Sequence, residues 1–143
     1  AVYIDETGRE SVRCSRADGL AFDVLRTLPL QLFILSTEKN AVVTQRAEKL
    51  KISVIQGEWH KSKTLQELAR EKGFDLTRTL YVGNDVNDYH AMKLCGYRAC
   101  PADSHPQILA IATHRLSTLG GQGVVRELVE DVLRIDIVKR MPV

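Results

Sequence analysis

The stretch that decides the fold is Gly83-Asn84-Asp85-Val86-Asn87-Asp88, which follows the apolar run Thr79-Leu80-Tyr81-Val82. A β-branched and aromatic run that stops at glycine and is followed by acidic side chains is typical of a buried parallel strand that ends in a site loop. Open α/β sheets bind ligands just beyond the carboxyl ends of their strands. Oxygen ligands at this place suit a hard cation such as Mg²⁺. Because Mg²⁺ also binds phosphate oxygens, such a site suits phosphate chemistry. The alternative is a solvated turn that caps the next helix, and this stretch alone does not separate the two.

Strands alternate with helices on both sides of this stretch. The predicted strands are 30–35, 53–55, 79–82, 96–100 and 115–116, and the predicted helices are 18–28, 40–50, 61–72, 88–94, 106–112 and 124–140. Asp18 is predicted to be the N-cap of the first helix. Strands and helices that alternate in this way imply a parallel sheet with right-handed crossovers. The predicted fold class is therefore α/β, a Rossmann-like three-layer sandwich.

A β-hairpin is predicted at the start of the chain. Val2-Tyr3-Ile4 and Ser11-Val12-Arg13-Cys14 flank Asp5-Glu6-Thr7-Gly8-Arg9-Glu10, a turn-rich segment. The chain opens at Ala1 with no initiator methionine, and we expect it to be the remainder of a longer protein.

Composition excludes several classes of function. With 143 residues, 44% hydrophobic and 27% charged, the chain is predicted to form one domain, 1–143, with a real core. A formal charge of +2 and scattered basic residues argue against a nucleic-acid partner. No apolar stretch approaches the ~20 residues of a membrane span. Three cysteines without zinc-site spacing are interpreted as buried or half-buried free thiols, which favours a reducing cytoplasm.

Three polar elements fall at the carboxyl ends of successive predicted strands. They are Ser36-Thr37, Lys61 after Gly57, and the acidic group Asn84, Asp85 and Asp88. Phosphoryl transfer needs such a set, because a hydroxyl and an ammonium hold phosphate oxygens while carboxylates hold Mg²⁺. Taken singly, Ser36-Thr37 is equally well interpreted as a helix cap. Lys61 taken singly is better interpreted as a surface residue, with Lys63 as a rival.

The order of these motifs resembles the haloacid dehalogenase (HAD) superfamily of phosphatases. Ser36 resembles its second motif, Lys61 its third, and residues 83–88 its acidic fourth. Three further stretches look like those of 3-deoxy-D-manno-octulosonate 8-phosphate phosphatases and of the phosphatase-like domains of acylneuraminate cytidylyltransferases. These are Ser15-Arg16-Ala17-Asp18-Gly19, Pro101-Ala102-Asp103-Ser104-His105-Pro106 and Gly120-Gly121-Gln122-Gly123-Val124-Val125-Arg126-Glu127.

The resemblance implies a Mg²⁺-dependent phosphatase that acts on a small phosphorylated sugar acid, of the octulosonate 8-phosphate or nonulosonate 9-phosphate type. In that family the first Asp of an Asp-x-Asp pair attacks phosphorus, and the second acts as general acid and base. The family's hairpin follows this pair directly, so the nucleophile is expected just upstream of Ala1. The implied roles are catalysis for Ser36 and Lys61, substrate binding for Arg16, Asp18, Gly19 and Thr37, and metal binding for Asn84, Asp85 and Asp88.

The chain departs from the family pattern at several positions. Asn84 stands where a metal-binding Asp is usual, which removes one negative charge. Thr37-Glu38 follows Ser36 where the octulosonate phosphatases have Gly-Arg, and Gln122 replaces an Arg of the glycine-rich segment. Both changes argue against octulosonate phosphate as the substrate. A rival placement makes Asp5 the nucleophile, since Asp5-Glu6-Thr7-Gly8 resembles the nucleophile loop of P-type ATPases, but the same segment is a good hairpin turn.

The spacing of the motifs leaves no room for a cap domain. In the resembled family the hairpins of four subunits assemble and each subunit covers its neighbour's site, so a homotetramer formed through the N-terminal hairpin is expected. The main alternative is a non-catalytic oligomerisation domain associated with a nucleotide-sugar (CMP-acylneuraminate type) synthetase. A receiver-like signalling domain is a third interpretation, but it gives no reason for the glycine-rich segment or the hairpin.

Overall fold

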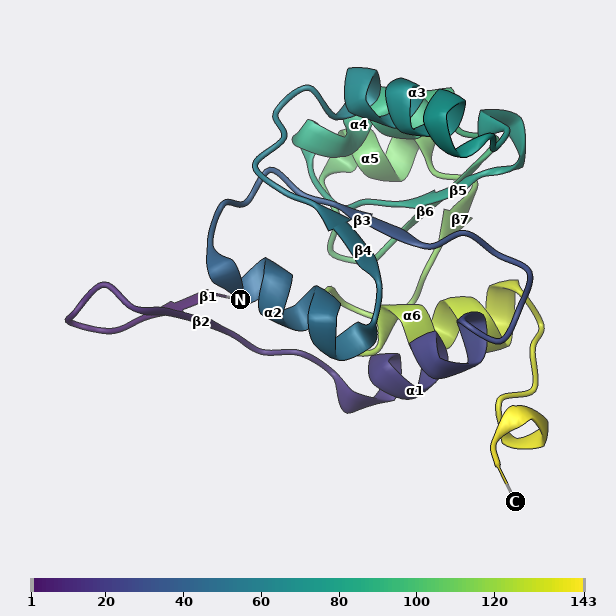
Figure 1. The fold of residues 1–143 in the computed structure, drawn as a ribbon, viewed down its shortest axis with the longest axis horizontal. Coiled ribbons are helices and arrows are strands. Elements are labelled where there is room, and N and C mark those ends of the chain that lie inside the picture. The colour runs from purple at the N-terminus through teal and green to yellow at the C-terminus, as the bar shows by residue number, and fades with distance from the viewer. Residues whose placement is uncertain (1, 143) are drawn as a thin grey trace. The chain divides into compact units, whose positions relative to one another are not determined.

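The structure is a computed structural model that describes residues 2–142. The chain forms two compact units. The first unit runs to Gly57 and resumes at Gly121, and the second is Glu58–Gly120. The first unit contains β1 (Val2–Ile4), β2 (Glu10–Val12), α1 (Arg16–Leu25), β3 (Phe33–Leu35), α2 (Ala41–Leu50), β4 (Ser53–Ile55) and α6 (Val124–Glu127), followed by a π-helical turn (Leu128–Val132) and a 3₁₀ turn (Val138–Arg140) (Figure 1).

The predicted hairpin is present. Strands β1 and β2 pair antiparallel, with Val2 opposite Val12. In the turn, Asp5 Oδ1 accepts hydrogen bonds from Thr7 N at 2.9 Å, Thr7 Oγ1 at 2.6 Å and Arg9 N at 3.0 Å. These bonds, the Thr7 hydroxyl first, lower the pKa of Asp5. Asp5 therefore acts as the turn residue, and its contacts do not support the rival placement as a nucleophile.

Strand β3 pairs parallel with β4 and is shorter than predicted. The register runs from Phe33 opposite Ser53 to Leu35 opposite Ile55. The predicted strand began at Leu30, but β4 has no residue to pair there, because the N–H of Ile52 is bonded to Ala47 O at the end of α2. All three residues of β3 are half-buried.

The core of the first unit joins α1 to the C-terminal segment. It consists of Ala21, Val24, Leu25, Val129 and Ile137. The predicted continuous helix 124–140 is wrong: α6 passes into the π-helical turn and ends near Arg134, whose φ is 57°. Ile135 N donates to Val129 O at 3.0 Å, so the chain closes the helix end there and returns Ile137 to the same core.

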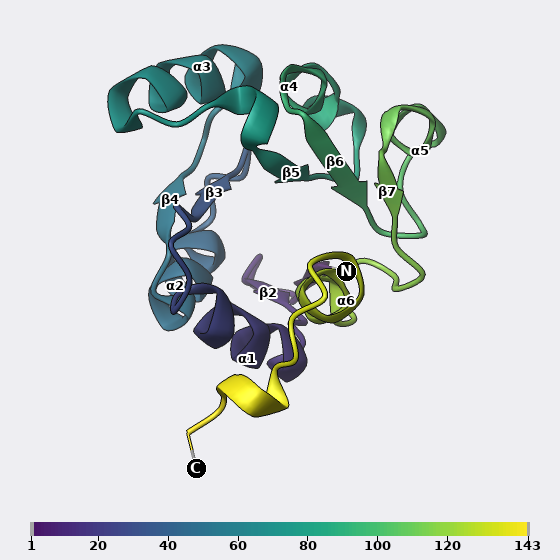
Figure 2. The ribbon, with the colours of Figure 1, turned by 90° about the vertical axis from the view of Figure 1, so that its right-hand side faces the viewer.

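The second unit has three helices on one face of a three-stranded parallel sheet (Figures 1 and 2). The strand order is β5-β6-β7, which makes β5 an edge strand of this sheet. Its elements are α3 (Lys61–Lys72), a 3₁₀ turn (Leu76–Arg78), β5 (Leu80–Val82), a second 3₁₀ turn (Val86–Asp88), α4 (Tyr89–Leu94), β6 (Tyr97–Cys100), α5 (Pro106–Ile111) and β7 (His114–Arg115).

Two of the three thiols are buried as predicted. Cys95 and Cys100 are buried in the second unit, and burial raises the pKa of the Cys95 thiol to about 11. Cys14 is exposed, which differs from the prediction. Among residues 2–142, no helix is long and apolar enough to cross a bilayer.

Candidate active site

Residues 83–88 lie where they were predicted, directly after the carboxyl end of β5. Asp88 is only 5% exposed, and Lys61 Nζ lies 2.6 Å from its Oδ1. The same Oδ1 accepts a hydrogen bond from Tyr81 OH at 3.0 Å, and Oδ2 accepts from Asn84 N at 3.1 Å. A charge this deeply buried requires a partner and several hydrogen bonds, and Asp88 has both. Asp88 is thus held in a buried polar cluster, while residues 84–87 are exposed and a capping box of Asp85 and Asp88 begins the 3₁₀ turn, so both interpretations of the stretch find support.

Lys61 is distinguished from its rival by burial. Lys61 begins α3 and is 7% exposed, whereas the Lys63 side chain is 76% exposed and lies 3.9 Å from Glu67. An ammonium group has three N–H donors, and Asp88 uses one of them. For the other two no acceptor is described among residues 2–142.

Gly83 is required by the close approach of Asp88. A Cβ built on Gly83 would lie 2.7 Å from Asp88 Cβ and 2.8 Å from its Cγ. Any larger residue would displace the carboxylate from Lys61. The glycine that signals the end of the strand in the sequence therefore also makes room for the site.

Tyr81 was missed by the sequence reasoning, which counted it only as part of an apolar run. Burial and the adjacent Asp88 carboxylate raise the pKa of Tyr81, so its hydroxyl stays protonated and donates to Asp88. The alternation of side chains along a strand could have placed residue 81 on one face. Nothing in the sequence says that this face meets Asp88.

Asn84 and Asp85 are exposed residues of the loop, and their side-chain oxygens can bind a metal ion. Asp85 Oδ1 accepts from Val86 N at 2.7 Å and caps the 3₁₀ turn, and the Asn84 side chain makes no hydrogen bond within the described chain. No group of three or more His, Cys, Asp or Glu lies together among residues 2–142. Mg²⁺ usually keeps several waters and binds one or two carboxylates, so one amide and one carboxylate oxygen fit part of its shell.

Ser36 and Thr37 follow β3, as predicted, in the other unit. Ser36 N donates to Ile55 O at 2.9 Å, and Ser36 Oγ accepts from Glu38 N at 3.1 Å. The hydroxyl thus supports a local turn. Lys61 belongs to the second unit, and the predicted convergence of Ser36 with Lys61 stays a prediction.

The predicted substrate residues near α1 have different environments. Arg16 is exposed, and Gly19 lies within the helix with open space beside it. Asp18 is not the N-cap of its own helix: Ser15 is, accepting from Ala17 N at 3.2 Å. Asp18 is instead buried, and its Oδ1 accepts from Val125 N at 2.9 Å and Arg126 N at 3.0 Å. It therefore caps α6, a contact between positions more than 100 residues apart that helix spacing alone does not predict.

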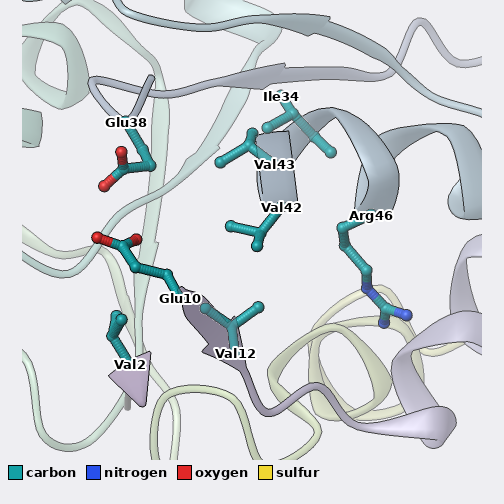
Figure 3. Close-up of a pocket in the computed structure, with 8 residues that line it drawn as sticks. All are labelled: Val2, Glu10, Val12, Ile34, Glu38, Val42, Val43 and Arg46. Atoms are coloured by element: carbon teal, nitrogen blue, oxygen red, sulfur yellow. The ribbon is translucent and has the colours of Figure 1, made fainter. Parts of the chain in front are cut away.

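A pocket of about 360 Å³ between the hairpin, β3 and α2 was also missed. Figure 3 shows Glu10 and Glu38 with their carboxylates at one end of it. The remaining lining residues are Val2, Val12, Ile34, Val42, Val43 and Arg46. Asn40 joins the two acids, because its Nδ2 donates to Glu10 Oε2 at 3.0 Å and its N to Glu38 Oε1 at 2.9 Å.

Replacing Asn40 tests this link between hairpin and helix. Asn40 Oδ1 also caps α2 through Val42 N at 3.0 Å, so Asn40→Ala should cost about 2 kcal/mol of unfolding free energy. Asn40→Ser keeps a capping oxygen but loses the amide donor, and should cost about 1 kcal/mol. Urea unfolding of the two variants measures the difference. Equal losses would mean that the bond to Glu10 contributes nothing.

A family model for haloacid dehalogenase-like hydrolases matches residues 29–128. The 3-deoxy-D-manno-octulosonate 8-phosphate phosphatase of Haemophilus influenzae is 29% identical over 134 residues, which are 93% of this chain and 74% of that protein.

Solved structures give the same result. A Streptomyces avermitilis protein assigned to the HAD family of hydrolases superposes with a TM-score of 0.89 at 42% identity, over 91% of this chain and 75% of that one. The 3-deoxy-D-manno-octulosonate 8-phosphate phosphatase of Moraxella catarrhalis was solved in complex with magnesium, phosphate and KDO. It superposes with a TM-score of 0.88 at 28% identity, over 94% of this chain and 78% of that one. The predicted α/β fold class with its N-terminal hairpin is confirmed.

Proposed function

The chain belongs to the haloacid dehalogenase-like hydrolases, and on that basis we propose that it is a phosphatase for a small phosphorylated sugar acid. The observation that supports this most directly is the buried Lys61–Asp88 pair at the carboxyl end of β5. Asp88 fixes the ammonium, and the two remaining N–H donors are directed to phosphate oxygens. A preorganised cation of this kind stabilises the charge that develops on a transferring phosphoryl group.

A reaction through an aspartyl-phosphate requires a carboxylate nucleophile, and Asp88 is unsuited to that role. Both of its oxygens already accept hydrogen bonds within the described chain. We propose that an Asp-x-Asp pair on a further strand supplies the nucleophile. The edge strand β5 consists of Leu80, Tyr81 and Val82 and has none of the charges that usually protect an exposed edge, so it is suited to pairing with such a strand.

The proposed reaction has two displacements. An oxygen of the first Asp attacks phosphorus and the bond to the sugar oxygen breaks, while the second Asp gives that oxygen a proton. The second Asp then takes a proton from water, whose oxygen attacks phosphorus and releases phosphate and the free carboxylate. In this scheme Ser36 and Lys61 hold the phosphoryl oxygens, and Thr37, Arg16 and Gly19 contact the sugar acid. The observed contacts of Asp18 are those of a helix cap.

A divalent cation fits the proposal. Mg²⁺ bound by Asn84 and Asp85, together with the proposed Asp-x-Asp pair, would neutralise charge on the phosphoryl group. For Asp88 the observed bonds to Lys61 and to Asn84 N favour a positioning role. Its direct ligation of a metal stays a prediction.

Substrate assays test the function as a whole. The gene is first read upstream of the codon for Ala1, where we expect an apolar strand that ends in Asp-x-Asp. The complete protein should then release phosphate from octulosonate 8-phosphate or a nonulosonate 9-phosphate at least about tenfold faster than from glucose 6-phosphate, and EDTA should abolish the release. If the Asp pair is absent, the covalent scheme is wrong and the alternative of a non-catalytic assembly domain is favoured.

The metal proposal predicts opposite effects at neighbouring positions. Asn84→Asp restores a negative charge and should lower the Mg²⁺ concentration for half-maximal rate severalfold, whereas Asp85→Asn should raise it about tenfold. Glu67→Gln, on the exposed face of α3, is the control and should leave it unchanged. A Mg²⁺ titration of phosphate release measures all three. Unchanged half-maximal concentrations in both loop variants would contradict the assignment.

The hairpin supports a proposal about assembly. Val2, Tyr3 and Ile4 are between 56% and 68% exposed, and an isolated two-stranded hairpin is marginal in water. We propose that hairpins of four copies pack together into a homotetramer.

Ile4→Lys should break up this assembly, because a lysine cannot be buried among apolar strands without a partner. Val138→Lys, at an 83% exposed valine in the same unit, is the matched control and should leave the tetramer intact. Light scattering after gel filtration should give about four times 16.0 kDa for the parent chain. A monomeric parent, or a variant that stays tetrameric, is the contrary result.

A further inference from the structure

A second cavity in the first unit is lined by basic and polar groups. Its volume is about 400 Å³, the size of a small-molecule site. The lining residues are Arg13, Cys14, Ser15, Arg16, Gly121 and Gln122. Two segments far apart in the sequence meet here: Cβ positions built on Gly121 and Gly123 would lie 3.6 Å from Arg13 O and 3.9 Å from Ser15 Oγ.

Neither arginine of this cavity forms an ion pair with an acidic side chain of residues 2–142. The Arg13 and Arg16 guanidinium groups also form no side-chain hydrogen bond with these residues. Of the carboxylates near the two arginines in sequence, Asp18 is buried and caps α6, and Glu10 accepts a hydrogen bond from Asn40 Nδ2 at 3.0 Å. Two like charges that line one cavity repel each other, and a bound anion would relieve this repulsion.

Other groups add to the positive potential. Arg46 Nη2 donates to Ser15 O at 3.2 Å, which places a third guanidinium against the same segment. The cavity also lies at the start of α1, a ten-residue helix whose N-terminal dipole favours anions. Gln122 contributes an amide that can donate two further hydrogen bonds.

We propose that this cavity binds the carboxylate or phosphate group of a small ligand. Arg13 and Arg16 bind its oxygens, since a guanidinium matches both groups with paired N–H donors. Ser15 and Gln122 line the site beside them. The proposal uses residues of the first unit only and does not involve Lys61. For Arg16 it rests on the proposed function and deepens it, because it names the group of the ligand that this side chain binds.

An NMR titration tests the site residue by residue. The ¹⁵N-labelled chain is titrated with inorganic phosphate and, separately, with sodium acetate, against sodium chloride at the same ionic strength. Saturable shifts of the Ser15, Gly121 and Gln122 amides are expected with phosphate, acetate or both, but not with chloride. The arm that saturates at lower concentration identifies the preferred group. Shifts that chloride reproduces, or none in either arm, would overturn the proposal.

Variants separate anion binding from folding. The double substitution Arg13→Ala and Arg16→Ala should abolish the saturable shifts and leave the midpoint of thermal unfolding unchanged or higher, because it relieves repulsion. Arg140→Ala, at an exposed arginine of the same unit that does not line the cavity, is the matched control and should bind as the parent does.

A carboxylate built into the cavity gives an independent test. Gln122→Glu places an acid in the cavity that the two arginines line, so it should raise the unfolding midpoint and weaken anion binding at least tenfold. Persistence of the shifts in the double variant contradicts the proposal, and so does unaltered binding by Gln122→Glu. The amides of Asn84 and Asp85 report on the Lys61 site in the same spectra, so failure at one site is distinguished from failure at the other.

Discussion

Replacing Lys61 with alanine is expected to reduce phosphate release by the complete enzyme at least about 10²-fold, because a preorganised donor to the transferring group is lost. The same change should lower the unfolding free energy by about 3 kcal/mol, since it leaves the Asp88 carboxylate buried without its counter-charge. A domain of ordinary stability tolerates this loss and stays folded. Phosphate release and urea unfolding measure the two effects separately.

The pairing of Lys61 with Asp88 is isolated by a double-mutant cycle. Lys61→Met and Asp88→Asn should each destabilise strongly, and the double variant should lose less than the sum, because neither residual charge is then stranded. Lys63→Met is the matched control. It changes an exposed lysine two positions away and should alter stability by no more than about 0.5 kcal/mol and leave the rate unchanged. Additive losses in the cycle would show that the two side chains do not interact.

Gly96→Ala is expected to have the largest effect on stability. A Cβ at Gly96 would lie 1.8 Å from Thr77 O and 2.6 Å from Thr77 C, so the backbone itself must move. That movement breaks the bond from Gly96 N to Leu76 O, 2.9 Å, and separates the starts of β5 and β6. We expect a loss of more than about 3 kcal/mol, at the upper end for overpacked sites.

Gly19→Ala is the matched control, because it adds the same methyl group inside α1 with nothing within 4 Å. Alanine is the better helix former, so this variant should gain about 0.5–1 kcal/mol. Chemical unfolding of both variants measures the two changes in unfolding free energy. A Gly96→Ala protein as stable as the parent would mean that the 3₁₀ turn at Leu76–Arg78 does not pack on Gly96 as described.

The sequence predicted the parallel α/β pattern because that pattern depends on local periodicity and on glycine and proline at element ends. Gly73 ends α3 and Pro106 begins α5 as expected. The predictions from sequence were wrong where contacts formed only on folding determine the bounds of an element. Strand β3 is short because of the position of Ile52, and the last helix ends early because Ile135 closes on Val129.

The order of Ser36, Lys61 and residues 83–88 along the chain, by itself, determined the site loop, its candidate residues and the resemblance to phosphatases. Only the tertiary structure decided which lysine is buried, that Tyr81 donates to Asp88, and that Asp18 caps α6 rather than its own helix. The physical reason is that strand ends and helix starts are fixed by neighbours in the sequence. Burial and hydrogen-bond partners are fixed by residues that meet only after folding, as Asp18 meets Val125 and Arg126.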